Sequence, residues 1–346
     1  MCNEQINQKF MATKNQKNLS IETLRGIAIL LVVMGHVIGY KSDEGMKVAD
    51  NSFLRHLYFT FEYLRMPLFT VISGWVYSLM PVTKNYFKIF TIKKCRRLLL
   101  PLVFVGGLYY ILQSIIPGTS NSYELKNIWR ILLFPYTFYW YLQSLFIVFF
   151  VISIIDSFKL SEKIYNWLII LALSFLLLIV RDDLFPETIQ NYFGFKGAIY
   201  LLPFFLIGVG VKRFESQFNN KYLLWTFGIT LIACLIFQQL SWYKVTDYVF
   251  SRYSGIGLII GITGTITLMH THFTNKWFAW LGNFAYSIFL FHSFGASGSR
   301  IIINALGIHN VAVVFFISLT FGMALPIVAE KILDRFKITR LLMLGR

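Results

Sequence analysis

Charged residues are scarce in this chain. Asp, Glu, Lys and Arg together make up 14% of its 346 residues, whereas 56% of the residues are hydrophobic and 18% are aromatic. A soluble domain normally carries about 25% charged residues, so this composition excludes a soluble globular protein. It instead indicates an integral membrane protein.

Cysteine is also scarce, and acidic residues are half as frequent as basic ones. Cys2, Cys95 and Cys234 give neither a metal-ligand spacing nor a disulfide framework, so we assign them no role and predict no metal site. The 32 Lys and Arg residues against 16 Asp and Glu give a net charge of +16. No basic stripe with interleaved exposed aromatic residues lies outside the membrane-flanking segments, so we do not predict nucleic-acid binding.

Long apolar runs separated by short polar breaks occupy most of the chain. Most runs extend over roughly 17 to 24 residues, which is long enough for a helix to cross a bilayer. They lack the strict alternation of a membrane β-barrel. We therefore predict an all-α, polytopic membrane protein with about ten transmembrane helices, near residues 26–40, 57–80, 98–116, 138–155, 164–180, 197–211, 222–240, 253–270, 277–295 and 311–330.

The basic residues predict the orientation in the membrane. When the breaks are assigned alternately from an inner N-terminus, 21 Lys and Arg fall on the cytoplasmic side, 10 fall on the other side, and Arg65 lies within a run. Both termini are therefore expected in the cytoplasm.

The predicted organisation is a polar cytoplasmic tail over 1–23, a ten-helix membrane domain over 24–331 and a basic cytoplasmic tail over 332–346. No small-x-small cleavage site follows the first run, which indicates a retained span.

Two polar residues mark the first run. Arg25 and His36 are eleven positions apart, so on a helix they share nearly one face, with roughly 16 Å between them. A cation at the mouth of a span suits a polyanionic cofactor. An imidazole deeper in the span suits proton transfer at the reactive end of that cofactor.

The second run contains Glu62 and Arg65, one helical turn apart. Ionisable groups near the centre of a span cost about 2.5–3.5 kcal/mol each on insertion scales, so both need partners. Two interpretations remain open. The residues neutralise each other near the outer surface, or Arg65 faces a polar cavity together with His36.

The densest positive cluster follows the second run and includes Lys93, Arg96 and Arg97. Such a cluster is typical of a cytoplasmic stop signal, which is a purely topological role. Guanidinium groups also bind phosphates in a bidentate manner. The cluster therefore also fits the docking of a nucleotide-bearing cofactor at the cytoplasmic mouth.

Two later runs contain further candidates. Aromatic residues gather around Trp140, as expected either for an interfacial aromatic belt or for a surface that stacks on a sugar ring. The ninth run contains Tyr286 and a second histidine, His292. A lone buried histidine is more often structural, but two histidines in different runs with few acids nearby favour a shared polar chamber.

Taken in order, these motifs resemble the membrane-bound acyltransferase-3 family, which includes O-acetyltransferases of bacterial cell-surface polysaccharides and fucose 4-O-acetylase-like proteins. The resemblance covers about residues 19–340. It rests on the Arg25 to His36 spacing, Met66-Pro67-Leu68-Phe69 with Ser73-Gly74, Arg96-Arg97 before Pro101, the Trp140 element, and the segment from Leu281-Gly282 through Tyr286-Ser287 to His292.

The resemblance implies a membrane O-acetyltransferase in the bacterial cytoplasmic membrane. Its donor would be cytoplasmic acetyl-CoA, and its acceptor a hydroxyl of a surface glycan or of a lipid-linked sugar. Activity would depend on His36 and Arg25, with His36 acting as a general base or as an acyl carrier. We expect Arg25, Lys93, Arg96 and Arg97 at the donor, and Arg65, Trp140, Tyr286 and His292 at the acceptor.

The chain departs from the family pattern at two places. Members often carry His where Arg65 stands, and those fused to an outer esterase-like domain often carry Glu shortly after the tryptophan, where this chain has Gln143-Ser144-Leu145. A competing hypothesis is a transporter or flippase of a lipid-linked sugar. The two halves of the chain show no inverted repeat that would support it, and a structural scaffold leaves Arg65, His36 and His292 without a role.

Overall fold

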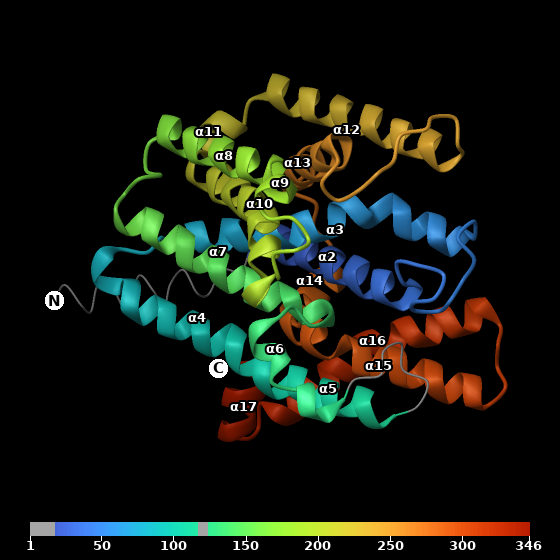
Figure 1. Ribbon diagram of the computed structural model, residues 1–346. Coiled ribbons are helices and arrows are strands. Elements are labelled where there is room, and N and C mark those ends of the chain that lie inside the picture. Colours follow the sequence, from blue (N-terminus) through green and yellow to red (C-terminus); the bar gives the residue numbers. More distant parts are fainter. Residues whose placement is uncertain (1–17, 117–123) are drawn as a thin grey trace.

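The computed structural model describes residues 18–116 and 124–346 (Figure 1). Within these ranges the protein is all-helical and has no strand. Most of the predicted N-terminal tail, with Cys2, lies outside the described residues, and the last part of that tail already belongs to the first long helix.

Every predicted apolar run is helical. The long helices are α2 (Leu19–Ile38), α3 (Phe53–Ser78), α4 (Phe87–Pro101), α7 (Trp140–Ser157), α8 (Ile164–Ile179), α10 (Phe195–Arg213), α12 (Lys221–Trp242), α13 (Gly255–His270), α15 (Ala285–Ala305) and α16 (Val311–Leu333). A π-helical turn (Leu102–Gly106) joins α4 to α5 (Gly107–Ile115). Shorter helices are α6 (Arg130–Leu133), α9 (Arg181–Leu184), α11 (Glu215–Phe218), α14 (Lys276–Asn283) and α17 (Lys337–Leu344).

Six of the described helical segments are long and apolar enough to cross a membrane. Helices α8 and α13 are apolar but only 16 residues long. Helices α3 and α15 are long enough but carry more polar residues. The prediction of an all-helical membrane protein is thus confirmed, while ten crossings and the side on which the termini lie stay predictions. The six segments are Leu19–Ile38, Lys84–Ile115, Leu125–Ser157, Tyr192–Arg213, Lys221–Trp242 and Val311–Leu333.

Two predicted boundaries differ from the structure. The basic cluster over 93–97 does not lie in a break, because α4 begins at Phe87 and carries the cluster within a continuous helix. The predicted run 277–295 is interrupted at Phe284, where α14 ends and α15 begins, and α15 continues to Ala305. The side chain of Asn275 caps α14 by accepting hydrogen bonds from two backbone N–H groups, which gives this short helix its own start.

Helix α2 occupies the centre of the protein. Within its most apolar stretch 78% of the residues are buried, against 6% in α12, which lies at the periphery (Figure 1). Helix α14 packs closely on α2 because a side chain at Gly26 or at Gly282 would collide with the backbone of the other helix. A central helix brings the polar residues of α2 into the interior, whereas the apolar surface of α12 is available to lipid.

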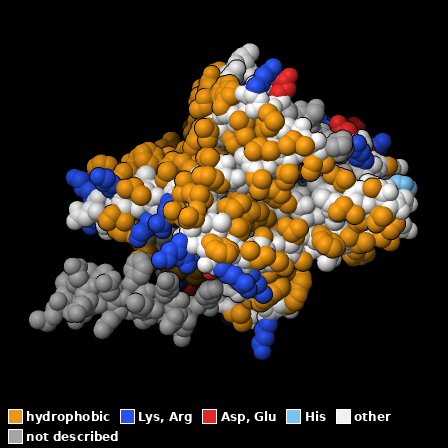
Figure 2. All heavy atoms as spheres, turned by 90° about the horizontal axis from the view of Figure 1, so that it is seen from below, with side chains coloured by type: hydrophobic (Ala, Val, Ile, Leu, Met, Phe, Trp, Pro, Cys, Tyr) orange, Lys and Arg blue, Asp and Glu red, His pale blue; other side chains and the backbone are white. Residues whose placement is uncertain are grey.

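The bundle has two distinct ends. The basic face carries the start of α2, the cations of α4 and helix α17, whereas the loop face carries the connections 39–52 and 243–254. Hydrophobic side chains cover much of the surface drawn in Figure 2, and most of the Lys and Arg side chains visible there gather toward one side. Helix α2 runs from the basic face to the loop face, and α3 runs back.

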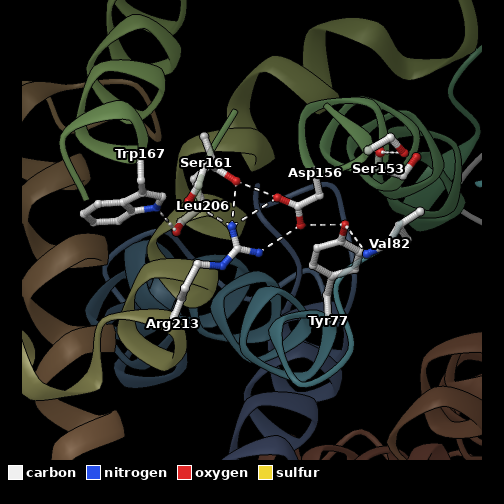
Figure 3. Close-up of polar contacts among 9 residues, drawn as sticks. Tyr77, Val82, Ser153, Asp156, Ser161, Trp167, Leu206 and Arg213 are labelled. Atoms are coloured by element: carbon white, nitrogen blue, oxygen red, sulfur yellow. Dashed lines mark hydrogen bonds and ion pairs between the residues drawn. The ribbon is translucent and has the colours of Figure 1, made fainter. Parts of the chain in front are cut away.

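An ion-pair network ties three helices together near the basic face (Figure 3). Arg213 of α10 donates to both carboxylate oxygens of Asp156 on α7, at 3.1 and 2.9 Å. Asp156 also accepts from the hydroxyls of Ser161, at 2.5 Å, and of Tyr77 on α3, at 2.9 Å. The Asp156 side chain is only 4% exposed, so its charge depends on these partners.

The charge distribution leads to a topology prediction. Reporter fusions after Arg97 and Arg346 should read cytoplasmic, and a fusion near Asp50 should read external, because Lys and Arg are retained on the inner side. Alkaline phosphatase and green fluorescent protein fusions measure the two outcomes. A cytoplasmic reading at Asp50 would contradict the orientation and would place the loop face inside the cell.

Candidate active site

Two histidines from distant parts of the chain meet in the interior. The rings of His36 on α2 and His292 on α15 lie 5.0 Å apart, and the ring of Phe138 contacts both, at 5.6 and 4.5 Å. His36 remains accessible to water although its neighbours Gly35 and Val37 are buried. The imidazole of His36 therefore borders an internal space between the helices.

Hydrogen bonds fix the tautomer of His292. Its Nδ1 faces two carbonyl oxygens of its own helix, those of Phe289 at 2.9 Å and Ile288 at 3.1 Å. Because a carbonyl only accepts hydrogen bonds, the proton of the neutral ring belongs on Nδ1. The Nε2 atom is fully buried and has no hydrogen-bond partner within the described part of the chain. His292 thus presents a vacant acceptor beside His36.

Arg65 lies directly beside this pair. Its guanidinium packs on Gly35, where any side chain would collide with it, and it donates a hydrogen bond to the hydroxyl of Tyr58. The guanidinium also lies 4.2 Å from the centre of the Tyr58 ring. The missing side chain at Gly35 therefore lets Arg65 approach the backbone next to His36.

Glu62 does not neutralise Arg65. Its carboxylate pairs instead with Arg252, at 3.2 Å, from the segment that precedes α13. The Glu62 side chain is only 7% exposed, so its negative charge needs a partner inside the protein. Arg252, which is 190 positions away in the sequence, provides that partner. The interpretation that Glu62 and Arg65 neutralise each other is therefore wrong. Arg65 lies in the interior, next to the backbone that precedes His36.

A basic cavity of about 490 Å³ opens at the basic face. Arg25, Lys94 and Arg97 line it, and its inner wall includes Phe69 and Phe289. Arg25 also contacts Glu22, with both carboxylate oxygens at 2.8 Å. The Lys94 ammonium lies 3.6 Å from the centre of the Phe149 ring, at the wall of the cavity. Three cations around one cavity favour an anionic ligand.

A second cavity, of about 620 Å³, opens at the loop face. Its lining combines aromatic rings with charged groups, among them Tyr40, Tyr58, Glu62 and Trp242. Aromatic faces and hydrogen-bonding groups together are suited to a polar ring such as a sugar. We call it the loop-side cavity.

The polar centre lies between these cavities on two antiparallel helices. Arg25 of α2 lines the basic cavity, and Tyr40, two residues beyond the end of α2, lines the loop-side cavity, with His36 between them in the sequence. On α3, Glu62 lines the loop-side cavity and Phe69 lines the basic cavity, with Arg65 between them. Along both helices the polar centre therefore lies between residues that line the two cavities.

The other predicted site residues fall in different places. Tyr286 lies in the wall of the basic cavity, where the Arg97 guanidinium stands 3.7 Å above its ring. Lys93 and Arg96 are exposed and are not part of that wall. Trp140 packs over Gly197 of α10 and lines neither cavity.

Sequence reasoning missed several residues of this region. Lys94 stands three positions before Arg97, so helical spacing places both on one face of α4, a signal that was available. Tyr40, Tyr58 and Arg252 gave no local signal, because their role depends on contacts with distant segments.

The apolar helices and the polar centre between the two cavities are those of a multi-pass membrane protein with an interior polar site. The chain belongs to the acyltransferase-3 family, because the family model described as an acyltransferase domain matches residues 18–330. It is also similar to nodulation protein NolL of Mesorhizobium japonicum, with 29% identity over 161 residues. That alignment spans 46% of this chain and 40% of NolL. No solved structure matches the chain.

Proposed function

We propose that this protein is a membrane O-acetyltransferase, which moves an acetyl group from acetyl-CoA to a hydroxyl of a cell-surface glycan or its lipid-linked precursor. The observation that carries the proposal is the position of His36, His292 and Arg65 between two cavities of different chemistry. Membership of an acyltransferase family supports acyl transfer as the reaction class.

The basic cavity is the proposed donor site. The phosphates of acetyl-CoA would bind at Arg25, Lys94 and Arg97, because guanidinium and ammonium groups bind phosphate by charge-assisted hydrogen bonds. The pantetheine arm would then extend inward along Phe69 and Phe289 toward the histidines. Under the predicted topology this cavity opens to the cytoplasm, where acetyl-CoA is made.

The loop-side cavity is the proposed acceptor site. A sugar there could stack on aromatic rings and form hydrogen bonds with Glu62 and its partner Arg252. The acceptor hydroxyl would reach His36 past Tyr58 and Arg65, which link the cavity to the centre. Under the same topology this cavity faces the outer surface, where cell-surface glycans are assembled.

The proposed reaction balances without a metal ion. The acceptor oxygen attacks the thioester carbonyl carbon, its proton passes to His36, and the carbon–sulfur bond breaks. The thiolate then takes the proton and leaves as CoA. Arg65 would stabilise the negative charge that develops on the carbonyl oxygen. In a two-step alternative His36 first takes the acetyl group and then passes it to the hydroxyl.

The donor assignment predicts a contrast among neighbouring cations. Lys94→Ala and Arg97→Ala should raise the KM for acetyl-CoA roughly tenfold with little change in kcat, because they remove ground-state contacts to phosphate. Lys93→Ala and Arg96→Ala, on the exposed side of the same helix, are the matched controls and should leave KM near the wild-type value. If all four substitutions change the KM for acetyl-CoA equally, Lys94 and Arg97 do not form a specific donor site, and the cluster serves only to orient the protein in the membrane.

A transporter of a lipid-linked sugar is the competing function, since intramembrane Arg and His residues also mark translocation paths. Surface glycans from cells with and without the gene discriminate between the two. An acetyltransferase changes the mass of the glycan by acetyl increments and leaves its amount unchanged. A transporter changes the amount of glycan at the surface and leaves its mass unchanged.

A further inference from the structure

A polar stripe lies away from both cavities, in a groove of about 90 Å³ between α5 and α15. Helix α15 contributes Ser293, Ser297 and Arg300 to the lining of this groove, and α5 contributes Tyr109. The three α15 residues recur at i, i+4 and i+7, so they form one stripe on a single helix face. The hydroxyl of Tyr109 interacts with both serines.

Several interior arginines, among them Arg25, Arg213 and Arg252, pair with a carboxylate. Arg65 bonds instead to the Tyr58 hydroxyl beside the histidines, and Arg97 to the Leu344 carbonyl at the basic cavity. Within the described ranges Arg300 has no carboxylate partner, and its side-chain hydrogen bond goes to the Ser297 hydroxyl at 3.4 Å. The stretch 117–123, which lies outside the described residues, contains no Asp or Glu. A half-buried guanidinium without a counter-charge is costly in a membrane protein, so its position favours an anion supplied from outside the chain.

We propose that Arg300 binds the phosphate of a lipid-linked acceptor, which enters the groove from the side of the bundle. Guanidinium binds phosphate through two parallel hydrogen bonds, and the serine hydroxyls beside it can donate further ones. The lipid chain would run along the apolar part of the groove, at Leu112, Ile116 and Ile301. This inference rests on the proposed function and narrows its acceptor to a phosphate-bearing lipid.

The groove is positioned to present such an acceptor to the histidines. Ser293 directly follows His292 on α15, and Arg300 lies seven positions farther on, or about 11 Å along the helix axis. The ring of Tyr109 lies 5.7 Å from the ring of Phe138, which contacts both histidines. Arg300 is also five positions from the end of α15, or about 8 Å along the helix axis, so under the predicted topology it would lie near the outer lipid headgroups. A phosphate held there would leave the attached sugar near the polar centre.

The test is a binding experiment that needs no acetyl donor. The purified full chain in phosphatidylcholine nanodiscs is titrated with farnesyl phosphate and with farnesol, which share a lipid chain and differ in the phosphate. We expect the wild-type protein to bind farnesyl phosphate roughly tenfold or more tightly than farnesol. Arg300→Gln should abolish that preference, Arg300→Lys should reduce it, and Arg335→Gln, an exposed arginine at the basic face, should preserve it.

Several outcomes would overturn the proposal. They are equal binding of farnesyl phosphate and farnesol to the wild-type protein, retention of the preference by a folded Arg300→Gln protein, and displacement of the lipid by an equal concentration of inorganic phosphate or by phosphatidylglycerol. Equal binding of the two lipids by the wild-type protein overturns the proposal even if the Arg300 variants do not fold. Since binding is measured without acetyl-CoA, loss of acetyl transfer and loss of phosphate binding are separate results.

Discussion

Replacement of His36 by Gln is expected to reduce acetyl transfer by on the order of 10²- to 10⁴-fold, which is the usual contribution of a general base. Gln keeps much of the volume and one hydrogen-bonding arm of the imidazole, but it cannot carry a proton at neutral pH. A structural histidine would tolerate the change. The measurement is the rate at which labelled acetyl groups from acetyl-CoA enter the glycan, normalised to the amount of protein in the membrane.

Two other histidines serve as comparisons. His270→Gln alters a histidine far from this centre, which bonds to the Ile266 carbonyl of its own helix and stacks on Phe218, and it should leave activity near wild type. His292→Gln should have a smaller effect than His36→Gln, because His292 is fully buried and acts beside the accessible imidazole. Near wild-type acetylation by the His36→Gln protein would remove His36 from the chemistry and would make the transporter hypothesis the better one.

Replacement of Asp156 by Ala is expected to lower the free energy of unfolding by about 3–5 kcal/mol, as found when one partner of a buried ion pair is removed. The substitution leaves the Arg213 guanidinium without its carboxylate and the Tyr77 hydroxyl without its acceptor (Figure 3). Unfolding of the detergent-solubilised protein measures the effect. Tyr77 also lines the basic cavity, so weaker donor binding should accompany the loss of stability.

A surface pair provides the control for this effect. Glu162 contacts Lys159 at 3.7 Å with both side chains largely exposed, so Glu162→Ala should change stability little. Asp156→Asn keeps hydrogen-bonding atoms but removes the charge. Its loss of stability should therefore lie between the losses caused by Asp156→Ala and by Glu162→Ala. If Asp156→Ala and Glu162→Ala are equally stable, the network in Figure 3 does not hold the three helices together.

The helices could be predicted from the sequence because each needs only a local signal. A run of apolar residues long enough to cross a membrane was sufficient, and its helical character was correct in every case. The predicted ends of the helices were less accurate where a helix begins in polar sequence or at a capping side chain instead of at the edge of an apolar run. Helix α4 begins in a polar segment at Phe87, and α14 owes its start to the side chain of Asn275, which caps it.

The site could be predicted in part. The Arg25 to His36 spacing follows from helix geometry alone, and it places these residues at a cavity and at the polar centre. The partner of Glu62 could not be found in this way, since Arg252 is 190 positions away. The contact between His36 and His292 likewise depends on how α2 and α15 pack, which periodicity within one helix does not reveal.

Acetyl transfer from the cytoplasmic side is measured with acetyl-CoA labelled in its acetyl group, supplied to sealed membrane vesicles that contain the protein and its glycan acceptor. We expect vesicles with the cytoplasmic side outward to transfer label to the glycan as an alkali-labile ester, and vesicles with the His36→Gln protein to transfer none. Vesicles of the opposite orientation should require permeabilisation. An unlabelled glycan with properly inserted wild-type protein would exclude acetyl transfer, and equal labelling from both sides of intact vesicles would exclude a donor site that opens only to the cytoplasm.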